Sequence, residues 1–136
     1  QLSVKLLPGA ARTVLQASDA ALVKSGTSTL EAMFLRRPMV VSYRMGTFSY
    51  QIAKRLMRSP YVALPNILLN EMQVPELLQY EGTPVKLAHA LLTELRRARE
   101  EPDYFRAFER IHGQLRCRAD VTAARAVIRL LGVGSS

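Results

Sequence analysis

Short apolar runs alternate with amphipathic segments through the first half of the chain. Each run consists mainly of valine, leucine, alanine or methionine and lies next to proline, glycine or serine. Such runs are typical of strands buried on both faces of a parallel sheet. Between them, residues 48–58 have Phe48, Ile52 and Leu56 on one helical face and charged residues opposite. The predicted strands are residues 2–7, 20–23, 39–43 and 61–64.

Helical spacing dominates the second half of the chain. Thr83 is a predicted N-cap, because Pro84 follows it at a position that favours the first turn of a helix. Strands that alternate with helices predict a doubly wound parallel sheet. We therefore expect an α/β fold in one unit, residues 1–136: a partial Rossmann-like sheet over 1–66, then a helical tail over 67–136. The predicted helices are residues 10–17, 29–35, 48–58, 74–80, 84–97, 103–112 and 120–131.

The chain has 136 residues, enough for one domain with a buried core. It opens at Gln1 directly on a predicted strand, so we expect that the beginning of the fold is missing. Such a half-sheet would expose an edge strand and recruit another chain, for example in a homodimer through the sheet or the tail. No signal peptide is evident, nor an apolar run of about 18 residues that would span a bilayer.

The net charge of +8 and the pI of about 10.3 favour anionic partners: nucleic acid, an acidic membrane or a phosphorylated substrate. The arginines after residue 95 are interleaved with acidic residues, which indicates a solvated helical face. The aromatic residues form no stacking platform, so we predict no nucleic-acid partner. Cys117 is the only cysteine, and two distant histidines indicate no metal site. The cysteine usage favours a reducing cytoplasmic setting, and we predict no cofactor.

Ser25, Gly26, Thr27 and Ser28 form a turn of small residues, here named the glycine turn, between a predicted strand and a helix. Ligands of open parallel sheets bind outside the carboxyl ends of the strands. Backbone N–H groups, hydroxyls and the following helix N-terminus suit phosphate oxygens there. Glu31, one helical turn later, would accept hydrogen bonds from ribose hydroxyls. The alternative is an ordinary capped helix start.

Two further strand ends carry polar residues. Arg44 follows the predicted strand 39–43 and would reach a phosphate or a base. Asn66 follows Pro65 at the end of the predicted strand 61–64. A surface arginine and an Asx turn are the respective alternatives. If the strands are parallel, all these groups open on one side of the sheet.

Several blocks in the same order resemble the lipid-A-disaccharide synthases, and the match runs in register from about Leu2 to Leu131. The glycine turn lies in the first block, Arg44 in the second and Asn66 in the fourth. Residues 70–72 depart from the family, since Asn70, Glu71 and Met72 stand where many members carry an Arg-Glu pair. The blocks are residues 17–33, 38–45, 53–56, 61–68, 74–79 and 116–120.

The resemblance implies the two-domain glycosyltransferase-B architecture, with UDP held by the C-terminal domain. The family transfers 2,3-diacylglucosamine from its UDP carrier to 2,3-diacylglucosamine 1-phosphate, an anionic lipid. The product is the β-1,6 lipid A disaccharide 1-phosphate, and UDP leaves. The reaction inverts the anomeric centre and needs no metal. The catalytic base lies in the N-terminal domain, so no residue of this chain is assigned that role, and this chain alone would be inactive.

By similarity, Ser25, Gly26 and Thr27 hold the diphosphate, with Ser28 beside them, and Glu31 holds the ribose. Arg44 and Asn66 line the same site. The resemblance further implies a peripheral position on the inner membrane of a Gram-negative bacterium. A basic RNA- or membrane-binding module without catalysis stays an alternative, as does another UDP-sugar glycosyltransferase. The residues predicted to face the membrane are Lys54, Arg55 and Arg58.

Overall fold

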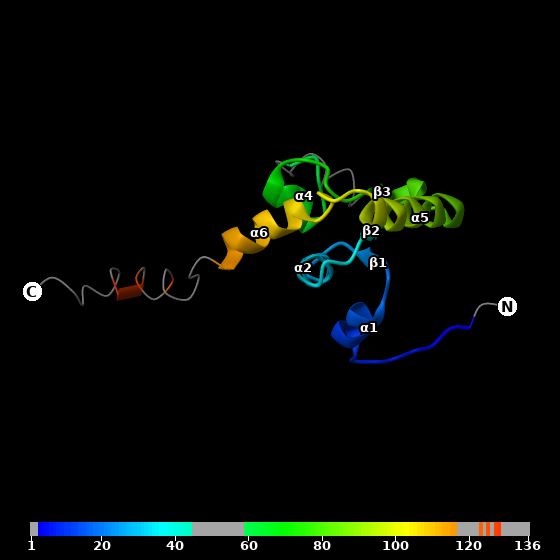
Figure 1. Ribbon diagram of the computed structural model, residues 1–136, viewed down its shortest axis with the longest axis horizontal. Coiled ribbons are helices and arrows are strands. Elements are labelled where there is room, and N and C mark those ends of the chain that lie inside the picture. The colour runs from blue at the N-terminus through cyan, green and yellow to red at the C-terminus, as the bar shows by residue number, and fades with distance from the viewer. Residues whose placement is uncertain (1–2, 45–58, 117–122, 124, 126, 129–136) are drawn as a thin grey trace, which may run out of the picture.

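The computed structural model describes residues 3–44 and 59–116, together with Ala123, Arg125, Val127 and Ile128 (Figure 1). Their core is a parallel sheet with helices packed against it. In chain order the elements are α1 (Ala11–Ala17), β1 (Ala21–Lys24), α2 (Ser28–Phe34), β2 (Met39–Tyr43), α4 (Leu64–Leu69), β3 (Glu76–Leu78), the 3-10 helix η1 (Gln79–Glu81), α5 (Pro84–Glu100) and α6 (Arg106–Arg116).

The sheet has the order β1-β2-β3, and both pairings are parallel. Lys24 lies opposite Ser42, and Tyr43 lies opposite Leu78, so the three strands end close to the same level. A parallel sheet with intervening helices confirms the predicted α/β, partial Rossmann-like class. β1 has no second neighbour among the described strands, so one of its edges is unpaired there.

β2 is the centre of the core. Met39, Val40 and Val41 are all fully buried, which requires cover on both faces of the strand. Met39 and Val41 belong to a cluster with Phe108 and Ile111 of α6, on the side where α2, α4 and α6 contact one another. Val40 alternates to the other face, and α5 contacts β1 and β2. The second half of the chain therefore supplies cover for strands of the first.

Two predicted strands are absent from the structure. Residues 3–7 belong to no strand, and Val4 and Leu6 are 80% and 84% exposed. A β-like run becomes a strand only where a neighbour completes its hydrogen bonds, and no described strand pairs with it. Residues 61–64 are also not a strand: the carboxylate of Glu76 accepts the backbone N–H groups of Val62 and Ala63, and α4 begins at Leu64.

The predicted helix 74–80 is wrong as well, because these residues contain β3 and the start of η1. The backbone N–H of Val41 donates to the carbonyl of Pro75 at 2.9 Å, and the ladder continues through Leu78. The predicted boundary at residue 66 thus falls inside α4, and the sheet continues into the part expected to be a helical tail. α5 and α6 confirm the helices predicted near 84–97 and 103–112.

Two other predicted helices lie outside the described residues, wholly for 48–58 and mostly for 120–131. The four described residues of the latter are helical. At the start of α5, the N-cap prediction is confirmed, since the Thr83 side chain accepts a hydrogen bond from the backbone N–H of Lys86. None of the described helices is both long and apolar enough to cross a bilayer.

A partly buried ionic cluster joins α5 to the segment that leads into α6. The Tyr104 hydroxyl donates to the Glu94 carboxylate at 2.7 Å, and Glu94 is only 2% exposed. Arg97 pairs with both Glu94 and Glu101, and its guanidinium lies over the Tyr104 ring, 5.4 Å from the ring centroid. Burial, together with the hydrogen bond to Glu94, raises the pKa of Tyr104 well above its usual range.

We predict that Tyr104→Phe lowers the free energy of unfolding by about 1–3 kcal/mol, because a buried carboxylate loses a hydrogen-bond donor. Urea denaturation measures the change. Tyr80→Phe is the matched control, since Tyr80 is 75% exposed, and it should leave the stability unchanged. Equal effects of the two substitutions would contradict the role of the cluster.

The stability that Tyr104 contributes should depend on pH. Its folded pKa lies above the usual value of 10.0, so its contribution is fully present below pH 10.0 and is lost as the pH rises further. The stability difference between the chain and Tyr104→Phe should therefore shrink above that pH. Denaturation curves at a series of pH values measure it. A difference that stays constant across this range would refute the assignment.

Candidate functional site

Two neighbouring strand ends bring the glycine turn and Arg44 together. β1 ends at Lys24 and β2 ends at Tyr43, and the register places Lys24 opposite Ser42. Because the strands are parallel, the residues that follow them lie at the same carboxyl edge, where ligands of such sheets bind. The predicted placement of the glycine turn and of Arg44 is confirmed, and the Arg44 side chain is exposed.

The glycine turn is held from its inner side. Gly26 has a φ of +136°, a conformation that other residues rarely adopt. Its carbonyl accepts the buried Thr29 hydroxyl at 2.6 Å and the Thr29 backbone N–H at 3.1 Å. A Cβ at Gly26 would meet nothing within 4 Å. Glycine is therefore required by the backbone conformation and not by lack of space.

The hydroxyls of the turn are not equivalent. Ser25 Oγ donates to the carbonyl of Val62 at 2.7 Å, and Ser28 Oγ donates to the carbonyl of Lys24 at 3.1 Å. A serine hydroxyl carries a single proton, so in this arrangement neither can donate to an anion. Thr27 is exposed, and its hydroxyl has no hydrogen-bond partner within the part of the chain that the structure describes. The turn thus offers Thr27 as its hydroxyl donor.

Glu31 lies one turn into α2 and is exposed. It lines a hollow of about 370 Å³ together with Arg12 of α1 and with Phe34 and Leu35. A carboxylate and a guanidinium beside apolar atoms provide an acceptor, donors and a surface for a flat ring. The sequence does not indicate Arg12, because nothing in its local pattern places it beside Glu31.

Asn66 does not lie at a strand end, so that prediction is wrong. It lies in α4 and is fully buried. Its Nδ2 donates to the carbonyl of Val74 at 2.8 Å and to Oε1 of Glu76 at 2.7 Å. Its Oδ1 accepts the backbone N–H groups of Gln73 and Val74. The amide is fully used inside the protein, which leaves it no hydrogen bond for a ligand.

The third strand end carries residues that the sequence pattern does not indicate. Gln79, Tyr80 and Glu81 follow β3 directly, at the edge shared with the glycine turn and Arg44. Gln79 has a φ of +53°, Tyr80 is 75% exposed, and Glu81 pairs with Lys86. The short apolar run that follows Pro75 signals this strand, but its spacing also fits the predicted helix 74–80.

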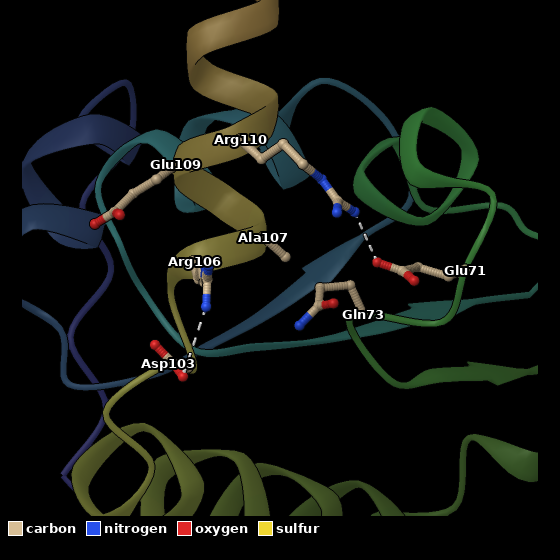
Figure 2. Close-up of a pocket in the computed structure, with 7 residues that line it drawn as sticks. All are labelled: Glu71, Gln73, Asp103, Arg106, Ala107, Glu109 and Arg110. Carbon is tan, nitrogen blue, oxygen red and sulfur yellow. Dashed lines mark hydrogen bonds and ion pairs between the residues drawn. The ribbon is translucent and has the colours of Figure 1, made fainter.

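A second hollow, of about 610 Å³, lies between α6 and the segment before β3 (Figure 2). Its charges are largely paired: Arg110 with Glu71 at 2.9 Å, and Arg106 more loosely with Asp103 at 3.9 Å. It contains none of the predicted site residues, and Glu71 is engaged there by Arg110. The lining residues are Glu71, Gln73, Asp103, Arg106, Ala107, Glu109 and Arg110.

The remaining predicted site residues are not placed. Lys54, Arg55 and Arg58 lie outside the described residues, so a membrane-facing surface there stays a prediction. Among the residues that are described, no group of three or more histidine, cysteine, aspartate or glutamate side chains is arranged to hold a metal ion.

We predict that Gly26→Ala costs about 1–3 kcal/mol of unfolding free energy, because alanine is strained at this φ. Gly113→Ala is the control: Gly113 lies in α6, and a Cβ there also meets nothing within 4 Å. It should stabilise the chain by about 0.5–1 kcal/mol, since alanine favours a helix. Urea denaturation distinguishes the two signs, and stabilisation by Gly26→Ala would contradict the strained turn.

The family model for lipid-A-disaccharide synthetase matches residues 1–127. The lipid-A-disaccharide synthases of Salmonella paratyphi B and of Escherichia coli O139:H28 are each 49% identical to the chain over 129 residues. The synthase of Yersinia pestis is 50% identical over the same length. In each case 95% of this chain is covered, but only 33–34% of the relative, so the chain spans about a third of their length. The chain belongs to the lipid-A-disaccharide synthetase family.

Proposed function

We propose that this chain is the UDP-binding part of a lipid-A-disaccharide synthase. The observation that carries the proposal is the common carboxyl edge of β1 and β2, which juxtaposes the glycine turn and Arg44. In a member of this family, that edge is where a nucleotide-sugar donor would be held.

The reaction proposed for the whole enzyme is the transfer of 2,3-diacylglucosamine from its UDP carrier to 2,3-diacylglucosamine 1-phosphate. It forms the β-1,6 disaccharide 1-phosphate and releases UDP, with inversion at the anomeric carbon and without a metal. The bond from the anomeric carbon to the diphosphate breaks as the acceptor 6-hydroxyl attacks. The base that takes the hydroxyl proton belongs to the other domain, so this chain alone is expected to be inactive.

The chain's part is to stabilise the charge that develops on the departing diphosphate. Preorganised donors and cations at the leaving group are the means by which a metal-free transferase lowers that barrier. Here the backbone N–H groups of the glycine turn, the Thr27 hydroxyl and the Arg44 guanidinium are the available groups. Glu31 would accept hydrogen bonds from the ribose hydroxyls, at the hollow that it shares with Arg12.

Peripheral contact with the inner membrane is part of the proposal, because the proposed donor and acceptor are both anionic lipids. The net charge of +8 favours an anionic surface. Lys54, Arg55 and Arg58 would supply part of that contact.

We predict that the chain binds UDP at least about tenfold more tightly than ADP, since a built donor site discriminates the base as well as the diphosphate. Calorimetric titration of each nucleotide measures the two affinities. Equal affinities would indicate that the positive charge alone binds diphosphates, and would contradict the proposed donor site.

Glu31→Gln tests the ribose contact. A carboxylate accepts charge-assisted hydrogen bonds on both oxygens, whereas the amide is neutral and carries an N–H₂ donor in place of one oxygen, so we expect UDP affinity to fall about tenfold. Glu109→Gln is the matched control, because Glu109 pairs with Arg36 on the surface away from the strand ends. UDP affinity that is unchanged in Glu31→Gln would remove Glu31 from the site.

A further inference from the structure

Glu76, the first residue of β3, makes contacts that a surface carboxylate would not make. Its Oε2 accepts the backbone N–H of Val62 at 2.9 Å, and its Oε1 accepts that of Ala63 at 2.9 Å. Oε1 also accepts Nδ2 of Asn66 at 2.7 Å. A carboxylate that receives two successive backbone N–H groups fixes both the position and the direction of that segment.

Asn66 holds the Glu76 carboxylate in place through its side-chain amide. Its side chain is fully buried and binds the backbone of Gln73 and Val74 as well as Glu76. It therefore ties α4 to the segment that leads into β3. With Asn66 in place, Glu76 has little freedom to leave Val62 and Ala63, because the amide would lose its partner in a buried position.

Val62 connects the hydrogen bonds of Glu76 to the proposed site. While the N–H of Val62 is bound by Glu76, its carbonyl accepts the Ser25 hydroxyl at 2.7 Å. Ser25 follows β1 and Glu76 begins β3, and these two strands are not neighbours in the sheet. Val62 thus links the glycine turn to β3 independently of the strand ladder.

We propose that Glu76 is a positioning residue for the donor diphosphate and acts through Val62 and Ser25. The inference rests on the proposed UDP site and assigns to it a residue that touches no ligand. The Ser25 hydroxyl donates its only proton to Val62, so its role is to anchor the turn. The backbone N–H groups of the turn are the donors to the diphosphate, and this anchor fixes their orientation. Hydrogen-bond strength falls steeply with misalignment, so release of the anchor weakens diphosphate binding.

A double-mutant cycle in UDP binding tests this route. Glu76→Gln exchanges a charged acceptor for an amide whose N–H₂ group would face backbone donors, and we expect UDP affinity to fall about tenfold. Ser25→Ala removes the other end of the link, with an expected loss of about fivefold. Because both act on one anchor, the double variant should be no more than about twofold weaker than Glu76→Gln.

Glu71→Gln is the control variant. It changes a half-exposed glutamate that lies between α4 and β3 and pairs with Arg110, and it should leave UDP affinity unchanged. Losses that multiply in the double variant, to about fiftyfold, would overturn the inference, because independent structural effects add in free energy. So would an unchanged affinity of Glu76→Gln.

If circular dichroism shows that Glu76→Gln is unfolded, Glu76→Asp replaces it in the cycle, since it retains a carboxylate on a shorter arm. The same coupling to Ser25→Ala is then expected, and additive losses again overturn the route. Absence of UDP binding by the unsubstituted chain would instead refute the proposed donor site itself. The two failures are therefore distinguishable.

Discussion

The parallel pairing of β2 with β1 on one side and β3 on the other is the constraint on which the rest of this structure depends. It buries Met39, Val40 and Val41, and so it requires helices on both faces of the strand. It also places three strand ends at one edge. The same pairing that makes the core thus gathers the glycine turn, Arg44 and the residues after β3.

The buried polar side chains make their direct contacts with other parts of the protein. Asn66 and Glu76 satisfy backbone groups that the sheet leaves unpaired, at Val62, Ala63 and Val74. Glu94 and Tyr104 likewise satisfy each other through a buried hydrogen bond between α5 and the segment that leads into α6. Buried polar groups of this kind are stabilising only when they are paired, so each fixes the relation between segments distant in sequence.

The candidate site divides accordingly into groups that face outward and groups that hold them. Thr27, Glu31 and Arg44 are exposed, and Ser25 and Ser28 direct their hydroxyl protons to carbonyls. The sequence alone does not show which of these polar residues contact a ligand. Their hydrogen-bond partners separate the two roles, because the single proton of a hydroxyl cannot be donated to a carbonyl and to a ligand at the same time.

The sequence by itself determined β1, α2, β2 and α5, the glycine turn and the family, because period, capping residues and ordered blocks of residues are local properties. Only the tertiary structure decided that residues 76–78 are the third strand and that residues 61–64 are not. It also decided that Asn66 supports the interior instead of facing the site. The physical reason is that a strand exists only where a neighbour satisfies its backbone, and that neighbour lies far away along the chain.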